Sequence, residues 1–174
     1  MKDRSIHFRP IGVIRTPHHE GQKTPIQPVF AKGIKGTVEM DPEYQKGLKD
    51  LDGFSHIYLL YYFDRSEEMN LRVVPYLDSR PRGLFATRAP HRPNKIGLSL
   101  VRLTGIQDRI LHIEDVDMLD QTPLLDIKPF IERFDVRTQT RCGWQGSVSD
   151  DVACNVGSRK HHLQNFKSKH DDRM

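Results

Sequence analysis

Short apolar segments separated by loops rich in Pro, Gly and Asn run along the first three quarters of the chain. Their lengths and their β-branched and aromatic residues are typical of strands. Residues 54–63 are apolar on both alternating faces, which predicts a strand buried on both sides. Residues 105–109, between the segments 96–104 and 110–116, predict a hairpin turn. The predicted strands are residues 8–15, 36–40, 54–63, 71–74, 83–87, 96–104 and 110–116.

Only one segment carries helix signals. Residues 41–51 begin with Asp41 as an N-cap and Pro42 at the first helical position, and Tyr44, Leu48 and Leu51 follow at helical spacing. Many short strands with almost no long helix predict a mainly β protein, either a small antiparallel barrel or a sandwich. The pattern decays after Trp144, so we expect one β domain over residues 5–145 and a polar, basic tail over residues 146–174.

Composition narrows the class of protein. The chain is 36% hydrophobic and 29% charged, and it has neither an apolar run long enough to cross a bilayer nor the apolar core of a secretory signal. Two cysteines without metal-binding spacing fit reduced thiols in a cytoplasmic protein. The histidine pairs at 18–19 and 161–162 lack a third ligand at metal spacing, so we expect no metal site.

The distribution of charge is more informative than the net charge of +4. Residues 79–107 contain no Asp or Glu but carry six Lys and Arg residues. An acid-free basic block favours a polyanionic partner. A solvated basic face without a partner is the open alternative.

Two segments carry candidate chemistry. Residues 87–99 form a stiff loop, because Pro90 and Pro93 keep the backbone out of a sheet, and this loop presents four basic residues. A proline-rich connector with ordinary surface charges is the alternative interpretation. In residues 117–130, Thr122–Pro123 is expected to end the preceding strand. Asp126 and Lys128 are two residues apart and point to the same side of an extended backbone, where a surface ion pair is the alternative to a catalytic role.

These segments resemble the TsaA-like (TrmO-like) family of tRNA threonylcarbamoyladenosine methyltransferases. Residues 83–97, GLFATRAPHRPNKIG, match the family signature G-x-F-A-T-R-S/A-P-x-R-P-N-x-I-G. Residues 117–130, DMLDQTPLLDIKPF, match a second one, D-x-x-x-G-T-P-x-x-D-I-K-P-Y/F. Shorter matches are IGVIR at 11–15, LDGFSH at 51–56, FDVR at 134–137 and GW at 143–144. The resemblance covers roughly residues 8–144.

The resemblance implies a small β-barrel rather than a Rossmann fold, a homodimer, S-adenosylmethionine as methyl donor and tRNA as acceptor. The chain has no G-x-G-x-x-G after its first strand, which agrees with a non-Rossmann fold. By the resemblance, the cofactor-binding residues are Pro28, Val29, Phe30, Asp64, Arg65, Arg88, Leu98, Asp117, Met118, Leu119 and Asp120.

The same resemblance suggests further roles. Arg92 and Lys95 are expected to bind the nucleic acid or the threonyl carboxylate, because a guanidinium or ammonium group pairs with such anions. Asp126 is a candidate general base, and Lys128 is expected to tune it. Two alternatives stay open: methylation of another RNA or a small molecule, and a non-catalytic module that binds S-adenosylmethionine or RNA.

Two positions depart from the family pattern. Asp64 stands where members carry His, and Gln121 stands where they carry Gly. An anion at position 64 changes the chemistry of a cofactor contact. Gln121 would strain its loop if the position requires a positive φ.

Overall fold

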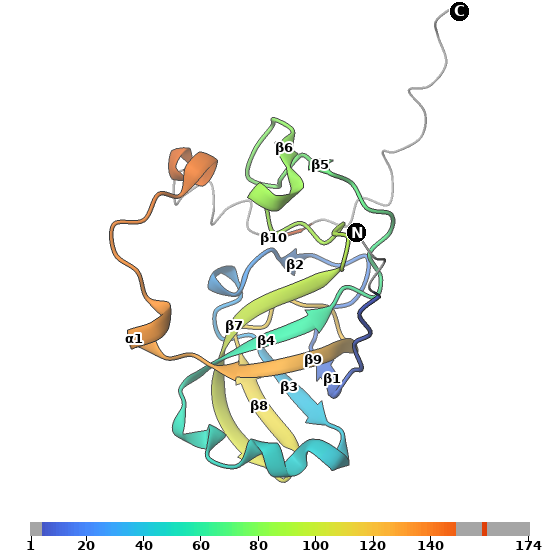
Figure 1. Cartoon of the computed structure of the whole chain (residues 1–174), viewed down its shortest axis with the longest axis vertical. Helices are drawn as coiled ribbons and strands as arrows, with labels where there is room; N and C mark the ends of the chain where they lie inside the picture. Colours follow the sequence, from blue (N-terminus) through green and yellow to red (C-terminus); the bar gives the residue numbers. More distant parts are fainter. Residues whose placement is uncertain (1–4, 149–157, 160–174) are drawn as a thin grey trace, which may run out of the picture.

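Six antiparallel strands close into a barrel in the order β1-β3-β8-β7-β4-β9 (Figure 1). The structure is a computed structural model and describes residues 5–148 and 158–159. The barrel strands are β1 (Gly12–Arg15), β3 (Lys35–Met40), β4 (His56–Tyr62), β7 (Ile96–Gln107), β8 (Ile110–Glu114) and β9 (Thr122–Pro129). The two small sheets pair β2 (Thr24–Pro25) with β10 (Ser158–Arg159) and β5 (Arg72–Val73) with β6 (Arg82–Gly83). The short helical elements are η1 (Pro28–Phe30), η2 (Pro42–Leu48), η3 (Leu51–Gly53), η4 (Leu84–Ala86), α1 (Glu132–Asp135) and η5 (Gly143–Ser147). The expected mainly β barrel is confirmed.

Side chains fill the barrel, as expected for so few strands. Alternate residues of each strand point inward, and Val38, Leu59, Val101 and Leu111 are all fully buried. The strand predicted at 96–104 continues to Gln107, and the hairpin to β8 turns at residues 108–109, inside the predicted 105–109. The alternation of apolar and polar residues along each strand therefore determines which side chains fill the barrel interior.

The prediction that residues 54–63 are buried on both faces was wrong. In β4, Ile57, Leu59 and Tyr61 are buried, whereas the alternate residues are partly exposed. A barrel has only one interior, so the second apolar face of β4 lies on the outer surface.

The predicted helix at 41–51 was wrong in type. The segment forms the two 3₁₀ turns η2 and η3, and Asp41 is the N-cap residue without a side-chain capping bond. Asp50 has a left-handed backbone with φ of +67°, which interrupts any continuous helix. Leu48 is nevertheless buried, and Tyr44 and Leu51 pack on the core, so the apolar spacing serves to close one end of the barrel.

Two strand boundaries also differ from expectation. Residues 84–86 leave the predicted strand and form η4, because Leu84 turns into the core and the hydroxyl of the following Thr87 donates to the Leu84 carbonyl at 2.8 Å. Thr122 and Pro123 open strand β9 rather than ending a strand, and they pair with Ile14 and Val13 of β1.

The antiparallel order gathers three long loops at one end of the barrel. β1, β4 and β8 end there, and β3, β7 and β9 begin there. We call this the loop end; it consists of residues 16–34, 63–95 and 115–121 and occupies the upper half of Figure 1. Most residues singled out from the sequence lie in these loops.

Candidate functional site

The loop end brings together segments that are far apart in the sequence. The Arg65 guanidinium donates a 2.8 Å hydrogen bond to the Asp120 carbonyl and lies 3.5 Å from the Glu20 carboxylate. The Arg88 guanidinium donates to the side-chain oxygen of Gln27, the residue before η1. Direct bonds therefore link Arg65 to the predicted cofactor segment 117–120, and Arg88 to the residue just before the predicted segment 28–30.

The β8–β9 loop is fixed by backbone and side-chain bonds to the first loop. Asp120 accepts a 3.1 Å hydrogen bond from the Thr16 backbone amide, and its own amide donates to the His18 carbonyl at 2.7 Å. The Thr16 hydroxyl donates to the Met118 carbonyl at 2.9 Å, and the Thr122 hydroxyl donates to the Leu119 carbonyl at 2.7 Å. This loop is a preorganised element of the loop end.

A buried polar chain lies beneath that loop. The Ser99 hydroxyl donates to Asp117 Oδ1 at 2.6 Å and contacts the Tyr61 hydroxyl at 3.1 Å. Asp117 is 2% exposed, so its carboxylate supports the loop from inside the barrel. Asp117 was predicted from the sequence as a cofactor residue, but its bond to Ser99 and the contact of Ser99 with Tyr61 were not predicted. The inward positions of Ser99 and Tyr61 on β7 and β4 were readable, but their pairing depends on strand register.

The signature loop, which is the part of the family signature that precedes β7 (residues 87–95), is hydrogen-bonded to the residues after β4. The Lys95 ammonium donates to the Ser66 carbonyl at 2.6 Å, and the Ser66 hydroxyl donates to the Pro90 carbonyl at 3.1 Å. The Arg92 guanidinium donates to the Thr87 carbonyl at 3.1 Å. In the described ranges no carboxylate lies within 4 Å of Arg92, Lys95 or Arg88, so their charges are not neutralised by ion pairing there.

Asp126 and Lys128 lie on the outer face of β9, on the same side as expected. Their charged atoms are 2.8 Å apart, and both side chains are substantially exposed. The hydrogen bond to Asp126 raises the pKa of Lys128 above its usual value. The geometry fits the surface ion pair, and any catalytic use of Asp126 requires a substrate approaching this face.

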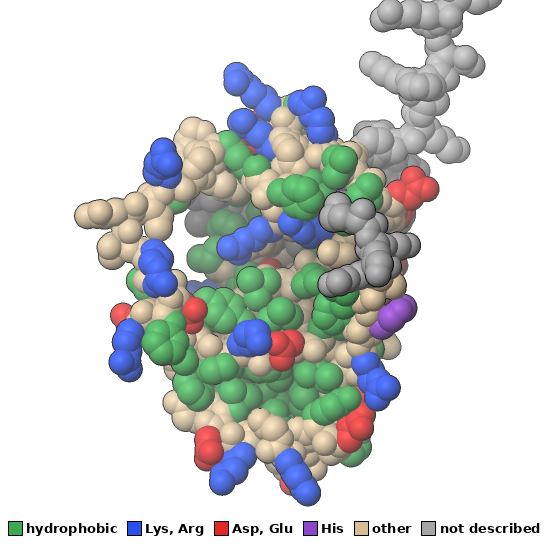
Figure 2. All heavy atoms as spheres, viewed as in Figure 1, with side chains coloured by type: hydrophobic (Ala, Val, Ile, Leu, Met, Phe, Trp, Pro, Cys, Tyr) green, Lys and Arg blue, Asp and Glu red, His purple; other side chains and the backbone are tan. Residues whose placement is uncertain are grey.

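The outer face around that pair is unusually apolar. We call Tyr58, Leu60, Leu98 and Leu100 the outer strip, because Tyr58 pairs with Leu100 and Leu60 with Leu98 across β4 and β7. Leu98 is 50% exposed, and the others are half-buried. Figure 2 shows hydrophobic side chains gathered over these strands. Burial raises the pKa of Tyr58 above its usual value, the charge of Asp135 raises it further, and the charge of Arg88 lowers it.

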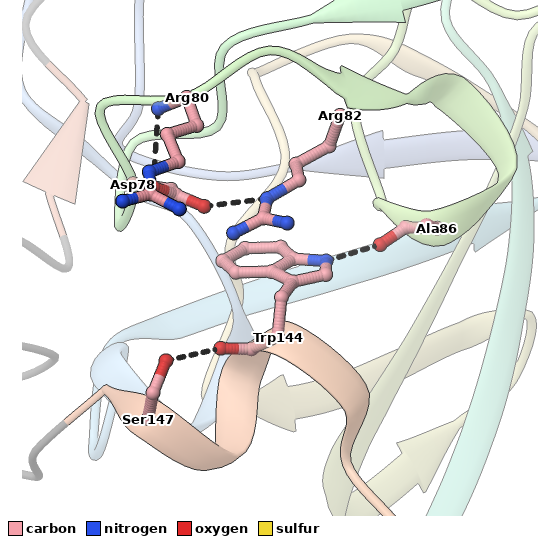
Figure 3. A network of polar contacts seen from close by, with 6 residues as sticks. All are labelled: Asp78, Arg80, Arg82, Ala86, Trp144 and Ser147. Atoms are coloured by element: carbon pink, nitrogen blue, oxygen red, sulfur yellow. Dashed lines mark hydrogen bonds and ion pairs between the residues drawn. The ribbon is translucent and has the colours of Figure 1, made fainter.

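A contact from beyond the barrel holds the signature segment. The Trp144 indole of η5 donates a 2.8 Å hydrogen bond to the Ala86 carbonyl, and the Arg82 guanidinium lies 5.6 Å from the indole ring centre (Figure 3). Arg82 in turn bonds Asp78 at 2.6 Å. This hydrogen bond lowers the pKa of Asp78 below its usual 3.8. The turn η5 crosses the expected boundary at residues 145–146, and most of the tail, 149–157 and 160–174, lies outside the described residues.

The remaining predicted cofactor residues differ in accessibility. Val29 is 76% exposed, Phe30 and Pro28 are half-buried in η1, and Met118 is buried. η1 packs against β7, the strand that carries Leu98. The turn η1, which carries the exposed Val29, therefore lies between Gln27, the partner of Arg88, and strand β7.

Both departures from the family pattern are visible in the backbone and charges. Gln121 has φ of +63°, so the position requires the left-handed conformation that Gly adopts without strain. Asp64 lies 3.7 Å from Arg65, which neutralises part of the negative charge introduced there.

No group of three or more His, Cys, Asp or Glu side chains in the described ranges could hold a metal ion. Likewise, none of the helices in those ranges is long and apolar enough to cross a membrane.

Comparison with known proteins agrees with this geometry. A family model, the tRNA-methyltransferase O N-terminal domain, matches residues 13–136. A Pyrococcus abyssi protein named "Probable S-adenosyl-L-methionine-binding protein" is 54% identical over 139 residues, covering 80% of this chain and 76% of the relative. The Escherichia coli tRNA (adenine(37)-N6)-methyltransferase is 36% identical over 73% of this chain.

Solved structures show the same fold. A crystal structure of TrmO from Pseudomonas aeruginosa superimposes with a TM-score of 0.67 at 36% identity, over 81% of this chain. The chain spans 63% of that protein and 58% of the E. coli enzyme. The family expected from the two signatures is confirmed: the chain belongs to the family of the tRNA-methyltransferase O N-terminal domain.

Proposed function

We propose that this chain is an S-adenosylmethionine-dependent methyltransferase that acts on N6 of adenine 37 in tRNA. Relatives over most of the chain carry the names S-adenosyl-L-methionine-binding protein and tRNA (adenine(37)-N6)-methyltransferase. The observation that carries the proposal is that the predicted cofactor segments meet at the loop end. These segments are residues 28–30, 64–65, 88 and 117–120. Arg65 is bonded to Asp120, and Arg88 is bonded to Gln27, just before the first segment. A tRNA acceptor also implies a cytoplasmic location.

The residues at the loop end fit the chemistry of this cofactor. Its carboxylate requires a cation, and Arg88 has no carboxylate partner in the described ranges. Its adenine requires apolar contacts, which the exposed Val29 and Leu98 offer. Backbone groups of residues 117–120 and the Asp64–Arg65 pair are suited to its ammonium and hydroxyl groups. The buried Asp117 and Met118 hold this surface from behind.

When bound, S-adenosylmethionine supplies a methyl group on a sulfonium, which needs no metal for transfer to a nitrogen nucleophile. The task of the protein is then to align the acceptor nitrogen with that methyl group. The stapled signature loop suits this role, because Lys95 and Arg92 are held by carbonyls while their charges remain available.

The finer acceptor in this proposal is threonylcarbamoyladenosine. Its N6 lies between the ring and a urea carbonyl, so its proton is more acidic than that of a plain amine. Its threonyl carboxylate matches the charge of Lys95 or Arg92, and the other cation is then available to a nearby phosphate. Asp126, with Lys128 at 2.8 Å, stays the candidate base, and this role requires the acceptor to reach the outer face of β9.

The proposed assembly is a homodimer in which the outer strip is covered by a second copy. The strip is apolar and is not covered within a single copy of the chain, where Leu98 is 50% exposed. Leu98 belongs to both the strip and the proposed cofactor site, so dimerisation would complete that site. Substituting Leu100 by Glu should yield monomers in light scattering, whereas unchanged dimers would exclude this face.

One experiment tests the function. The purified chain is incubated with labelled S-adenosylmethionine and with tRNA that carries or lacks the threonylcarbamoyl group. Transfer only to the modified tRNA supports the proposal, and transfer to unmodified tRNA changes the acceptor. Cofactor binding without transfer would favour the binding-module alternative, which is motivated by Asp64 and Gln121.

A further inference from the structure

Phe85 is an aromatic side chain held in solvent by a rigid turn. It is 73% exposed, although it follows Leu84, which is buried in the protein interior. The Leu84 amide donates to the Leu71 carbonyl at 2.9 Å, and Trp144 donates to the Ala86 carbonyl at 2.8 Å. The backbone is thus anchored on both sides of Phe85, and Figure 3 shows the bond on the Ala86 side.

A cation is fixed beside this ring. The Arg92 guanidinium carbon lies 5.6 Å from the Phe85 ring centre, and the same guanidinium donates to the Thr87 carbonyl. No carboxylate in the described ranges forms an ion pair with Arg92. The pair therefore combines a large exposed apolar surface with an uncompensated positive charge.

The surroundings share this mixed character. Leu71, Val74 and Tyr76 are each more than half exposed, and they lie near Arg72 and Arg80 of the β5–β6 segment. Figure 2 shows hydrophobic and basic side chains side by side at the top of the view, over these strands. A surface that mixes exposed apolar and basic side chains is complementary to unpaired bases and phosphates together.

We propose that Phe85, backed by Arg92, is a stacking platform for one unpaired base of an RNA loop, with Arg92 also pairing with a neighbouring phosphate. This inference rests on the proposed tRNA acceptor and adds a residue outside the cofactor site. RNA is favoured over a protein partner because residues 83–97 contain no acidic residue, and Arg88, Arg92 and Lys95 form no ion pair in the described ranges.

The test uses an anticodon stem-loop RNA and a series of copies with one abasic nucleotide each in the loop. Phe85→Ala should weaken binding of the intact RNA about 5- to 150-fold, the range of one stacked base, and Phe85→Trp should restore it. One abasic position should weaken binding by the wild-type chain but not by Phe85→Ala, since base and ring act as a pair.

The matched control is Phe134→Ala. That ring also carries an Arg, with Arg133 at 5.7 Å, and is 59% exposed, but it lies in the acidic helix α1. Phe134→Ala should bind RNA as the wild type does. Arg92→Gln should reduce the salt dependence of binding by about one unit of slope, whereas Phe85→Ala should leave the slope unchanged.

The outcomes separate the two proposals. The stacking role is overturned if Phe85→Ala binds RNA with wild-type affinity. It is also overturned if the variant becomes monomeric and binds every abasic RNA more weakly than the wild-type chain by the same factor. Absence of RNA binding by the wild-type chain overturns it as well. Base-dependent RNA binding through Phe85 without methyl transfer refutes the enzymatic function and supports the platform.

Discussion

The Ser99 hydroxyl donates a 2.6 Å hydrogen bond to the buried carboxylate of Asp117 and connects it to Tyr61. A hydroxyl has one hydrogen, and Ser99 gives it to the carboxylate, so Tyr61 is the donor in the 3.1 Å contact. Strands β4 and β7 are thereby joined to the β8–β9 loop at the point where the loop end meets the core.

Ser99→Ala removes the hydroxyl that lies between Tyr61 and Asp117 in this series of hydrogen bonds. We expect the free energy of unfolding to fall by about 1–3 kcal/mol, because a buried acceptor loses a donor. Denaturant unfolding measures this change. Ser5→Ala, at an exposed serine, serves as control and should change stability by less than about 0.5 kcal/mol. Equal stabilities of the two variants would contradict a stabilising role for the Ser99–Asp117 bond.

Gly97→Ala should overpack the same region. A Cβ at Gly97 would lie 2.2 Å from Cε2 of the Tyr61 ring, so the ring must move, at a cost of about 1–3 kcal/mol. Gly105→Ala on the same strand is the control, since its Cβ would meet nothing within 4 Å. Combining Gly97→Ala with Tyr61→Leu should cost less than the sum of the single changes, and strict additivity would refute the clash.

Gln121→Gly should stabilise the chain. The φ of +63° at Gln121 strains any residue with a Cβ, and the strain relieved exceeds the added entropy of the unfolded chain by about 0.5–1 kcal/mol. Gln121→Ala keeps the Cβ and should give no gain. Thermal unfolding of the three proteins checks this, and a loss of stability in the Gly variant would contradict it.

Acid below about pH 4 should release Trp144 from its contact with Arg82. Arg82 holds the pKa of Asp78 below 3.8, so this pair stabilises the fold above pH 3.8 and its contribution is lost as the pH falls through the lowered pKa. The chain has one tryptophan, so its fluorescence reports the contact. We expect steady emission from pH 7 to about 4 and a red shift below. Asp78→Asn should shift the emission to the red at pH 7, and far-UV circular dichroism verifies that the barrel persists. Unchanged emission would show that the Asp78–Arg82 pair does not hold Trp144 in place.

Asp126→Asn tests the candidate base. If Asp126 removes the proton from N6 of the methyl-accepting adenosine, the turnover of Asp126→Asn should be lower by about 100-fold or more, while its cofactor affinity changes little. Glu39→Gln, which removes another exposed ion-pair partner, should leave turnover unchanged. Equal losses of turnover and cofactor affinity would assign Asp126 a structural role instead.

The sequence predicted those features that depend on local period. Asp126 and Lys128 share a face because strand side chains alternate, and residues 36–40 and 110–116 were recognisable by composition. The Tyr61–Ser99 contact was not predictable, because it depends on the pairing of β4 with β7. The helix expected at 41–51 failed because apolar spacing does not distinguish an α-helix from successive 3₁₀ turns.

The bond from Trp144 to Ala86 bears on where the functional unit ends. The family model stops at residue 136, yet a residue eight positions further fixes the turn that presents Phe85. A fragment trimmed to 13–136 would retain the barrel strands except for Gly12, the first residue of β1, and would lose the bond from Trp144 to Ala86. The minimal recombinant protein for RNA work should therefore extend through Ser147, beyond the boundary that sequence similarity alone defines.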